Sequence, residues 1–225
     1  MALRTLTDFG ALRADSEILG IGAGDEATIF WLTNHVHRVF ATDLYLTPGE
    51  WEGTAPPVML SDPHPPIPLP WDPQKLVVQH MNALDLRYAD ESFDGIFSSS
   101  SIEHFGTPGD VRRSVEEMVR VLRPGGILTV ATEYRLAGPS PGFPGTLLFS
   151  QSELANLFAG LPLTAVSPWS LHLSRNTRRV VVDFKEAVDD MTAKRPRFST
   201  YPHIVLQLGR HRWTSVHLGF QKTAV

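Results

Sequence analysis

Residues 17–43, EILGIGAGDEATIFWLTNHVHRVFATD, contain the pattern of a strand, a glycine turn, a helix and a second strand that ends in an acid. The apolar run at residues 18–21 is typical of a parallel strand that is buried on both faces. Gly22 and Gly24 follow at once, and glycine lets the backbone turn tightly and approach a ligand without a Cβ in the way. The stretch therefore predicts a βαβ unit of an α/β sheet, with a ligand at the glycine turn.

The second half of this stretch completes the unit. Residues 27–34, ATIFWLTN, are strongly apolar and have the length of a short helix that packs against a sheet. Residues 39–41 then form the next strand. Asp43 at its end lies about 20 residues after the turn, the position of an acid that holds the ribose hydroxyls of a nucleotide. The unit is therefore expected to bind a nucleotide cofactor.

Two such cofactors, NAD and S-adenosyl-L-methionine, fit this pattern. The segment from Gly22 to Ala27 matches G-x-G-x-x-A, which does not separate them. NAD would place its pyrophosphate at the start of the helix, where the carboxylates of Asp25 and Glu26 repel it. S-adenosyl-L-methionine has no phosphate, and its sulfonium and ammonium groups are positive. The two acids therefore favour the methyl donor, and a nicotinamide oxidoreductase is the weaker alternative.

The composition is that of an ordinary globular protein. The chain has 225 residues, 42% of them hydrophobic, and we expect one α/β domain over residues 1–225. A net charge of -4 gives no sign of a basic surface for nucleic acid, and the absence of cysteine excludes disulfides and thiolate chemistry. With no apolar run long enough to cross a membrane and no signal peptide, we expect a cytoplasmic location. The oligomeric state is not predicted.

A proline-rich segment follows the first βαβ unit. Nine of the chain's 18 prolines lie between Pro48 and Pro73, and a helix cannot continue through that composition. We therefore expect an insert at about residues 46–74, where a doubly wound fold would place its second helix. Trp51 and Trp71 favour packing over disorder, which predicts a lid or a wall of the substrate site.

The rest of the chain returns to regular structure. Thr107 and Pro108 have the pattern of an N-cap and first residue of a helix, which Pro124-Gly125-Gly126 would end. Ser150 and Glu153 form a capping box for a second helix. Residues 161–202 have no clear pattern. Further strands are expected at 76–78, 92–97 and 127–132, with Glu133-Tyr134-Arg135 at the end of the last, and an antiparallel hairpin at 203–208 and 213–220.

Four motifs together resemble the class I S-adenosylmethionine-dependent methyltransferases, especially the set called methyltransferase type 11. They are GIGAG (20–24), MNALDL (81–86), ESFDGIFSSSSIEHF (91–105) and VEEMVRVLRPGGILTVATE (115–133). The resemblance implies a doubly wound, Rossmann-like, seven-stranded sheet with a C-terminal antiparallel hairpin. It also implies an enzyme that methylates a small-molecule acceptor at oxygen or nitrogen by in-line transfer and releases S-adenosyl-L-homocysteine.

The resemblance also implies roles for individual residues. The turn backbone would face the methionine part of the cofactor, Asp43 the ribose and Leu44 the adenine. Asn82 and Ala83 would hold the adenine edge, with Asn82 where the family more often has Asp. The cofactor-binding set is therefore expected to comprise Gly20, Gly22, Gly24, Asp43, Leu44, Asn82, Ala83, Ser98 and Ser99.

Two positions depart from the family pattern. Gly20 stands where the family usually has an acid, and Glu26 replaces the usual third glycine. These departures leave open an alternative, in which the chain is a non-catalytic or degenerate cofactor-binding module that partners another enzyme.

Methyl transfer to a hydroxyl or amine needs alignment, exclusion of water and a group that removes a proton. His104 is the first candidate for this base because histidine titrates near neutrality, and Glu133 and Tyr134 are the second. The alternative for His104 is a histidine that hydrogen-bonds and fixes its loop. Some relatives hold a metal with an additional glutamate three residues before the Glu-His pair; Ser100 stands there, so no metal site is expected.

Overall fold

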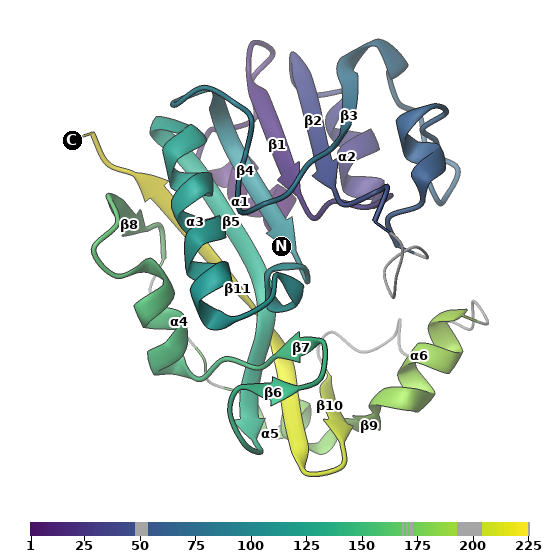
Figure 1. The fold of residues 1–225 in the computed structure, drawn as a ribbon, viewed down its shortest axis with the longest axis vertical. Coiled ribbons are helices and arrows are strands. Elements are labelled where there is room, and N and C mark those ends of the chain that lie inside the picture. The colour runs from purple at the N-terminus through teal and green to yellow at the C-terminus, as the bar shows by residue number, and fades with distance from the viewer. Residues whose placement is uncertain (48–53, 168, 170, 172, 193–203, 225) are drawn as a thin grey trace.

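The computed structural model describes residues 1–47, 54–167, 169, 171, 173–192 and 204–224. It contains one large sheet with helices on both faces, α3 on one side and α1 and α2 on the other (Figure 1). Trp51 and His203, which figured in the sequence predictions, lie outside the described ranges. The α/β class predicted from the sequence is confirmed.

The strands of the sheet follow the order β3-β2-β1-β4-β5-β11-β10-β9, and β8 also pairs with β11. The first seven in this order form the expected sheet, with β10 and β11 as its antiparallel hairpin. β8 and β9 are short additional strands that the sequence did not predict. The bounds are β1 Glu17–Ile21, β2 Arg38–Asp43, β3 Leu76–His80, β4 Phe93–Ser99, β5 Leu122–Ala137, β8 Leu163–Ala165, β9 Val181–Asp183, β10 Val205–Leu208 and β11 His211–Lys222.

The helices carry the predicted caps. Thr107 and Asp110 form a capping box at the start of α3, and Ser150 and Glu153 form another at α4. The described helices are α1 Ala2–Asp8, α2 Ala27–Leu32, α3 Pro108–Val121, α4 Gln151–Phe158, α5 Arg175–Arg179 and α6 Phe184–Thr192, with 3-10 turns η1 Pro57–Leu60, η2 Pro73–Lys75 and η3 Ile102–His104. Within the described ranges, no helix combines the length and the apolar composition that crossing a bilayer requires.

β1 lies between β2 and β4 and runs parallel to both. Gly20 pairs with Ala41 on one side and Phe97 on the other. The carboxyl ends of the three strands therefore meet at one edge, and ligands of open α/β sheets bind just outside that edge. In Figure 1 these ends point toward the part of the molecule that contains β6 (Gly142–Phe143), β7 (Thr146–Leu147) and α6.

β5 is longer than the sequence predicted. The expected strand, residues 127–132, was to end at the ligand edge, but β5 starts at Leu122 and continues through Ala137. At the start of the strand, Leu122 pairs with Phe93 of β4. At its end, β11 pairs with it from Ile127 to Ala137 and supplies hydrogen-bond partners past the end of β4. Glu133 and Tyr134 are therefore inside a strand, which corrects their expected place at a strand end.

The described part of the proline-rich insert packs against the fold. Ala55 and Met59 are buried, and the ring of Trp71 meets that of Phe30 edge-on, with centroids 5.0 Å apart. The backbone N–H of Asp72 also donates to Thr33 Oγ1 at 2.8 Å. Packing rather than disorder is thus confirmed for residues 54–74, while closure as a lid stays a prediction.

Candidate active site at the carboxyl edge of β1, β2 and β4

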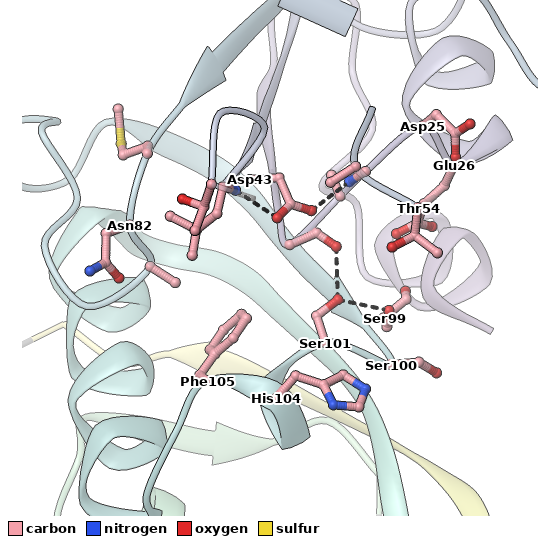
Figure 2. Close-up of a pocket in the computed structure, with 18 of the residues that line it drawn as sticks. Asp25, Glu26, Asp43, Thr54, Asn82, Ser99, Ser100, Ser101, His104 and Phe105 are labelled. Atoms are coloured by element: carbon pink, nitrogen blue, oxygen red, sulfur yellow. Dashed lines mark hydrogen bonds between the residues drawn. The ribbon is translucent and has the colours of Figure 1, made fainter. Parts of the chain in front are cut away.

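Asp43 connects the glycine turn to the end of β2. Its Oδ2 accepts the backbone N–H of Gly24 at 2.9 Å, and its Oδ1 accepts the N–H of Leu44 at 2.7 Å (Figure 2). Burial raises the pKa of Asp43 above its ordinary value, against the opposing effect of these two hydrogen bonds. The acid therefore fixes the turn as well as facing the cavity.

Neighbouring residues approach the turn so closely on two sides that only glycine fits at positions 22 and 24. Both have positive φ, 60° and 48°. A Cβ on Gly22 would lie 2.5 Å from the Cβ of Ser101, and a Cβ on Gly24 would overlap the carbonyl oxygen of Thr54. The turn is thus enclosed between the loop after β4 and the insert, and a side chain at either glycine would displace one of them.

The carbonyl groups of the turn already accept hydrogen bonds. Ser101 Oγ donates to Gly22 O at 2.7 Å, and the buried Tyr45 hydroxyl donates to Gly24 O at 2.7 Å. The N–H of Glu26 donates to the carbonyl of Ala23 at 3.1 Å. The backbone of residues 22–24 is therefore held rigidly by its neighbours.

Three carboxylates, those of Asp25, Glu26 and Asp43, surround this turn. Glu26 Oε1 is buried and has no hydrogen-bond partner in the part of the chain that the structure describes. Burial, and secondarily the nearby charges of Asp43 and Asp25, raise the pKa of Glu26 to about 7. A cationic ligand with N–H donors would both satisfy this oxygen and neutralise the cluster.

A cavity of about 630 Å³ opens in front of these groups, a size in the range of small-ligand sites. Figure 2 shows the ring of Phe105 between Asn82 and Ser101, with His104 beside it. The lining residues are Gly22, Ala23, Gly24, Asp25, Glu26, Asp43, Leu44, Thr47, Thr54, Ala55, Met81, Asn82, Ala83, Leu84, Ser99, Ser100, Ser101, His104, Phe105 and Gly106.

The cavity brings together most of the predicted cofactor-binding residues. Gly20 and Ser98 are not part of its lining: Gly20 lies within β1, where a Cβ would come 2.7 Å from Phe97 Cζ, and Ser98 is buried in β4. The predicted residues that do line the cavity are Gly22, Gly24, Asp43, Leu44, Asn82, Ala83 and Ser99.

His104 lies at the rim of the cavity, in η3. Its Nδ1 is 2.7 Å from the carbonyl oxygen of Gly145, in the turn between β6 and β7. A carbonyl only accepts, so Nδ1 carries the proton of the neutral ring and Nε2 is the basic nitrogen. The hydrogen bond fixes the loop, which is the alternative role that the sequence left open for His104. It also defines a tautomer that suits a base.

A buried glutamate, Glu103, lies beside His104. Glu103 Oε1 is 4.0 Å from His104 Nε2, and Glu103 Oε2 accepts the Thr132 hydroxyl at 2.8 Å. Burial, and secondarily Glu133, raise the pKa of Glu103 to about 8, and burial raises the pKa of Glu133 to about 7. Glu133 and Tyr134, the second candidates for the base, do not line the cavity.

Several lining residues were not predicted as part of the site. Thr54 and Ala55 belong to the insert, whose sequence gives no sign of which residues reach the turn. Ser101 and Phe105 lie in the FSSSSIEHF motif, which could have indicated them. Among the described residues, no three His, Asp or Glu side chains are grouped so as to hold a metal.

S-adenosyl-L-methionine fits these residues. The unpartnered Glu26 oxygen and the neighbouring acids complement a cation and would repel the pyrophosphate of NAD. Asp43 at the end of β2 and Asn82 after β3 line the same cavity as these acids.

Comparisons with known proteins identify the family. The family model described as methyltransferase domain matches residues 19–130, which contain the turn, Asp43, Asn82 and His104. O-methyltransferase rstn1 of Aspergillus nomiae is 43% identical over 61 residues, 27% of this chain and 26% of that protein. The chain thus aligns with about a quarter of the length of this curated relative.

Solved structures share the fold over nearly the whole chain. A putative methyltransferase from Bacillus halodurans superimposes with a TM-score of 0.63 at 16% identity, covering 99% of both chains. The 1,6-didemethyltoxoflavin-N1-methyltransferase of Burkholderia thailandensis, with 1,6-didemethyltoxoflavin and S-adenosylhomocysteine bound, has a TM-score of 0.55 at 19% identity. That match covers 99% of this chain and 76% of the other.

Proposed function

Since this chain belongs to the S-adenosyl-L-methionine-dependent methyltransferases, we propose that it transfers the methyl group of this cofactor to an oxygen or nitrogen of a small-molecule acceptor. The observation that carries the proposal is the cavity, which has an acidic glycine turn on one side and His104 on the other. The Burkholderia enzyme, which binds a small molecule, supports the acceptor class, and the name of the Aspergillus relative favours oxygen.

The cofactor would lie along the edge formed by β1, β2 and β4. Asp43 would accept the ribose hydroxyls, Leu44 would contact the adenine ring, and Asn82 and Ala83 would border its edge. Gly22, Gly24 and Ser99 would border the methionine part. When bound, the cofactor supplies an electrophilic methyl group on its sulfonium.

His104 would remove the proton of the acceptor. Its Nε2 is the basic nitrogen because Nδ1 donates to Gly145, and this bond also holds the ring in place. Glu103, at 4.0 Å from Nε2, would stabilise the imidazolium that results whenever the carboxyl group is ionised. Phe105 and the insert residues Thr54 and Ala55 would exclude water from the reacting groups.

Product formation from radiolabelled cofactor tests the proposal. The protein is incubated with [methyl-³H]-S-adenosyl-L-methionine and a panel of phenols and nitrogen heteroaromatics, and label is measured in the extracted products. We expect label in at least one class, and turnover of His104→Ala lowered about 100-fold. Absence of label across the panel would count against a small-molecule acceptor.

The matched control is His37→Ala, an exposed histidine before β2. We expect wild-type turnover for this variant. Both variants should bind S-adenosyl-L-homocysteine with the wild-type Kd. Unchanged turnover of His104→Ala would remove this residue as the base, while loss of cofactor binding would assign it a structural role.

A further inference from the structure

Glu26 lines the cavity, and one oxygen of its carboxylate has no hydrogen-bond partner among the residues that the structure describes. Its Oε1 is buried, and no donor reaches it from the described residues. Leaving such an oxygen unsatisfied is unfavourable. Asp43 differs, since both of its oxygens accept backbone N–H groups.

The alternative acceptors at the turn are already engaged. The carbonyl groups of Gly22, Ala23 and Gly24 accept from Ser101, Glu26 and Tyr45. The Thr28 side chain hydrogen-bonds to the Glu26 carboxylate, but Oε1 has no partner among the described residues. A ligand that brings strong N–H donors to this turn would therefore meet Glu26 Oε1 as an acceptor without a partner.

The two cations of the cofactor differ in what they can offer this oxygen. The α-ammonium group carries three N–H donors, whereas the sulfonium carries none. Among the described residues that line the cavity, none is Lys or Arg. The Glu26 oxygen can therefore accept hydrogen bonds from the α-ammonium group but not from the sulfonium.

We propose that the Glu26 carboxylate binds the α-ammonium group of S-adenosyl-L-methionine and so makes the amino-acid part of the cofactor a determinant of affinity. The inference rests on the cofactor placement of the proposed function. Glu26, which stands where the family usually has its third glycine, would then have a role in cofactor binding.

The contact also couples cofactor binding to protonation. The titratable groups that face Glu26 are Asp25, Asp43 and Tyr45. The charge of His64 lowers the pKa of Asp25, and that of His80 lowers the pKa of Asp43. With a pKa of about 7, Glu26 is partly protonated in the free protein, and an ammonium partner would ionise it. Binding at pH 7 is therefore expected to release about half a proton.

Calorimetric titration with three ligands tests the contact. S-adenosyl-L-homocysteine keeps the ammonium but not the sulfonium, and 5′-methylthioadenosine lacks the whole amino-acid part. We expect Glu26→Gln to weaken S-adenosyl-L-homocysteine and S-adenosyl-L-methionine equally, by about 10- to 100-fold, and to leave 5′-methylthioadenosine within about twofold. Asp25→Asn, the neighbouring acid, is the control and should have an effect several times smaller.

Titrations of the wild type in phosphate and in Tris at pH 7 measure the released proton without relying on a variant. Release that Glu26→Gln abolishes would support the contact. Equal weakening of all three ligands, weakening of S-adenosyl-L-methionine alone, or wild-type binding without proton release would overturn it. If the wild type binds none of the three ligands, the cofactor placement itself fails, and that result is distinct from an unaffected Glu26→Gln.

Discussion

The backbone N–H of Gly24 and the carboxylate of Asp43 are joined by a hydrogen bond of 2.9 Å, so the turn after β1 and the end of β2 form one unit. Asp43 also accepts the N–H of Leu44, the residue that borders the cavity next to it. The same carboxylate therefore shapes the turn and offers its remaining lone pairs to a ligand. A change at this residue is expected to affect both stability and cofactor binding.

Asp43→Ala is expected to abolish detectable binding of S-adenosyl-L-homocysteine. In the proposed cofactor placement, the variant loses the acceptor for the ribose hydroxyls. It also leaves two backbone N–H groups without their partner, at a cost in stability of about 2 kcal/mol. Calorimetric titration measures the binding and urea unfolding measures the stability. NAD serves as the control ligand and should bind neither protein, and wild-type affinity in the variant would exclude Asp43 from the site.

Gly24→Ala is expected to destabilise the protein more than Gly10→Ala. Both glycines have positive φ, which costs an alanine about 1 to 2 kcal/mol. A Cβ at Gly10 meets nothing within 4 Å, whereas one at Gly24 overlaps the carbonyl of Thr54. Urea unfolding should show about 1 kcal/mol lost at Gly10 and at least about 3 at Gly24.

Equal losses at the two glycines would mean that the insert moves aside without cost. The Gly10 variant isolates the effect of backbone conformation, so the difference between the variants reports how firmly Thr54 is held against the turn. A firmly held Thr54 is what a wall of the cavity requires.

The parts of the fold that the sequence predicted are those with strong local patterns. The apolar runs of β1 and β4 and the capping boxes of α3 and α4 are encoded in a few consecutive residues. β8 and β9 have three residues each and exist because β11 and β10 pair with them. The length of β5 likewise depends on β11, and such long-range pairing leaves no local pattern.

Some residues of the candidate site could likewise be predicted from a local sequence pattern, and others could not. Gly22, Gly24 and Asp43 follow from one βαβ motif, so their positions could be predicted. The approach of Thr54 to Gly24 depends on how the insert packs against α2, through contacts such as Trp71 with Phe30. The unpartnered state of Glu26 Oε1 follows from burial, which the sequence does not specify at this position.

Glu103→Gln is expected to make the protein more stable at high pH. The pKa of Glu103 is about 8 in the folded state, above its ordinary 4.5, so its neutral form is the one that the fold accommodates. The contribution of protonated Glu103 to the free energy of unfolding is complete below pH 4.5 and is lost as pH rises through 8. The loss is up to about 5 kcal/mol, at about 1.4 kcal/mol for each unit of pKa shift. Glutamine stays neutral and keeps an oxygen for the Thr132 hydroxyl.

Urea unfolding at pH 4.5, 7 and 9 checks this expectation. The advantage of Glu103→Gln over the wild type should grow steadily from the first pH to the last. Glu116→Gln, an exposed glutamate on α3 whose side chain is 51% accessible, should show no such trend. A constant difference at all three pH values would mean that Glu103 is ionised in the folded protein at neutral pH.

His217→Gln is expected to reduce the loss of stability in weak acid. His217 Nε2 lies 2.9 Å from Thr5 Oγ1 of α1 and 3.0 Å from Thr129 Oγ1 of β5. Burial, and secondarily the N-terminal ammonium group, lower its pKa to about 4. Between pH 6.5 and 4 the unfolded chain binds a proton that the folded chain does not, so the wild type loses stability over this window.

The raised pKa values of Glu26, Glu103 and Glu133 act in the opposite direction over part of this window, because protonation of these groups favours the folded state as pH falls. The contribution of His217 is therefore measured as the difference between wild type and His217→Gln in urea unfolding from pH 7 to pH 4. We expect that difference to shift in favour of the variant as pH falls, with His37→Gln as the exposed control that shows no shift. A parallel pH dependence of wild type and variant would mean that His217 is protonated within the fold, and α1 would then be held to the sheet by a charged rather than a neutral imidazole.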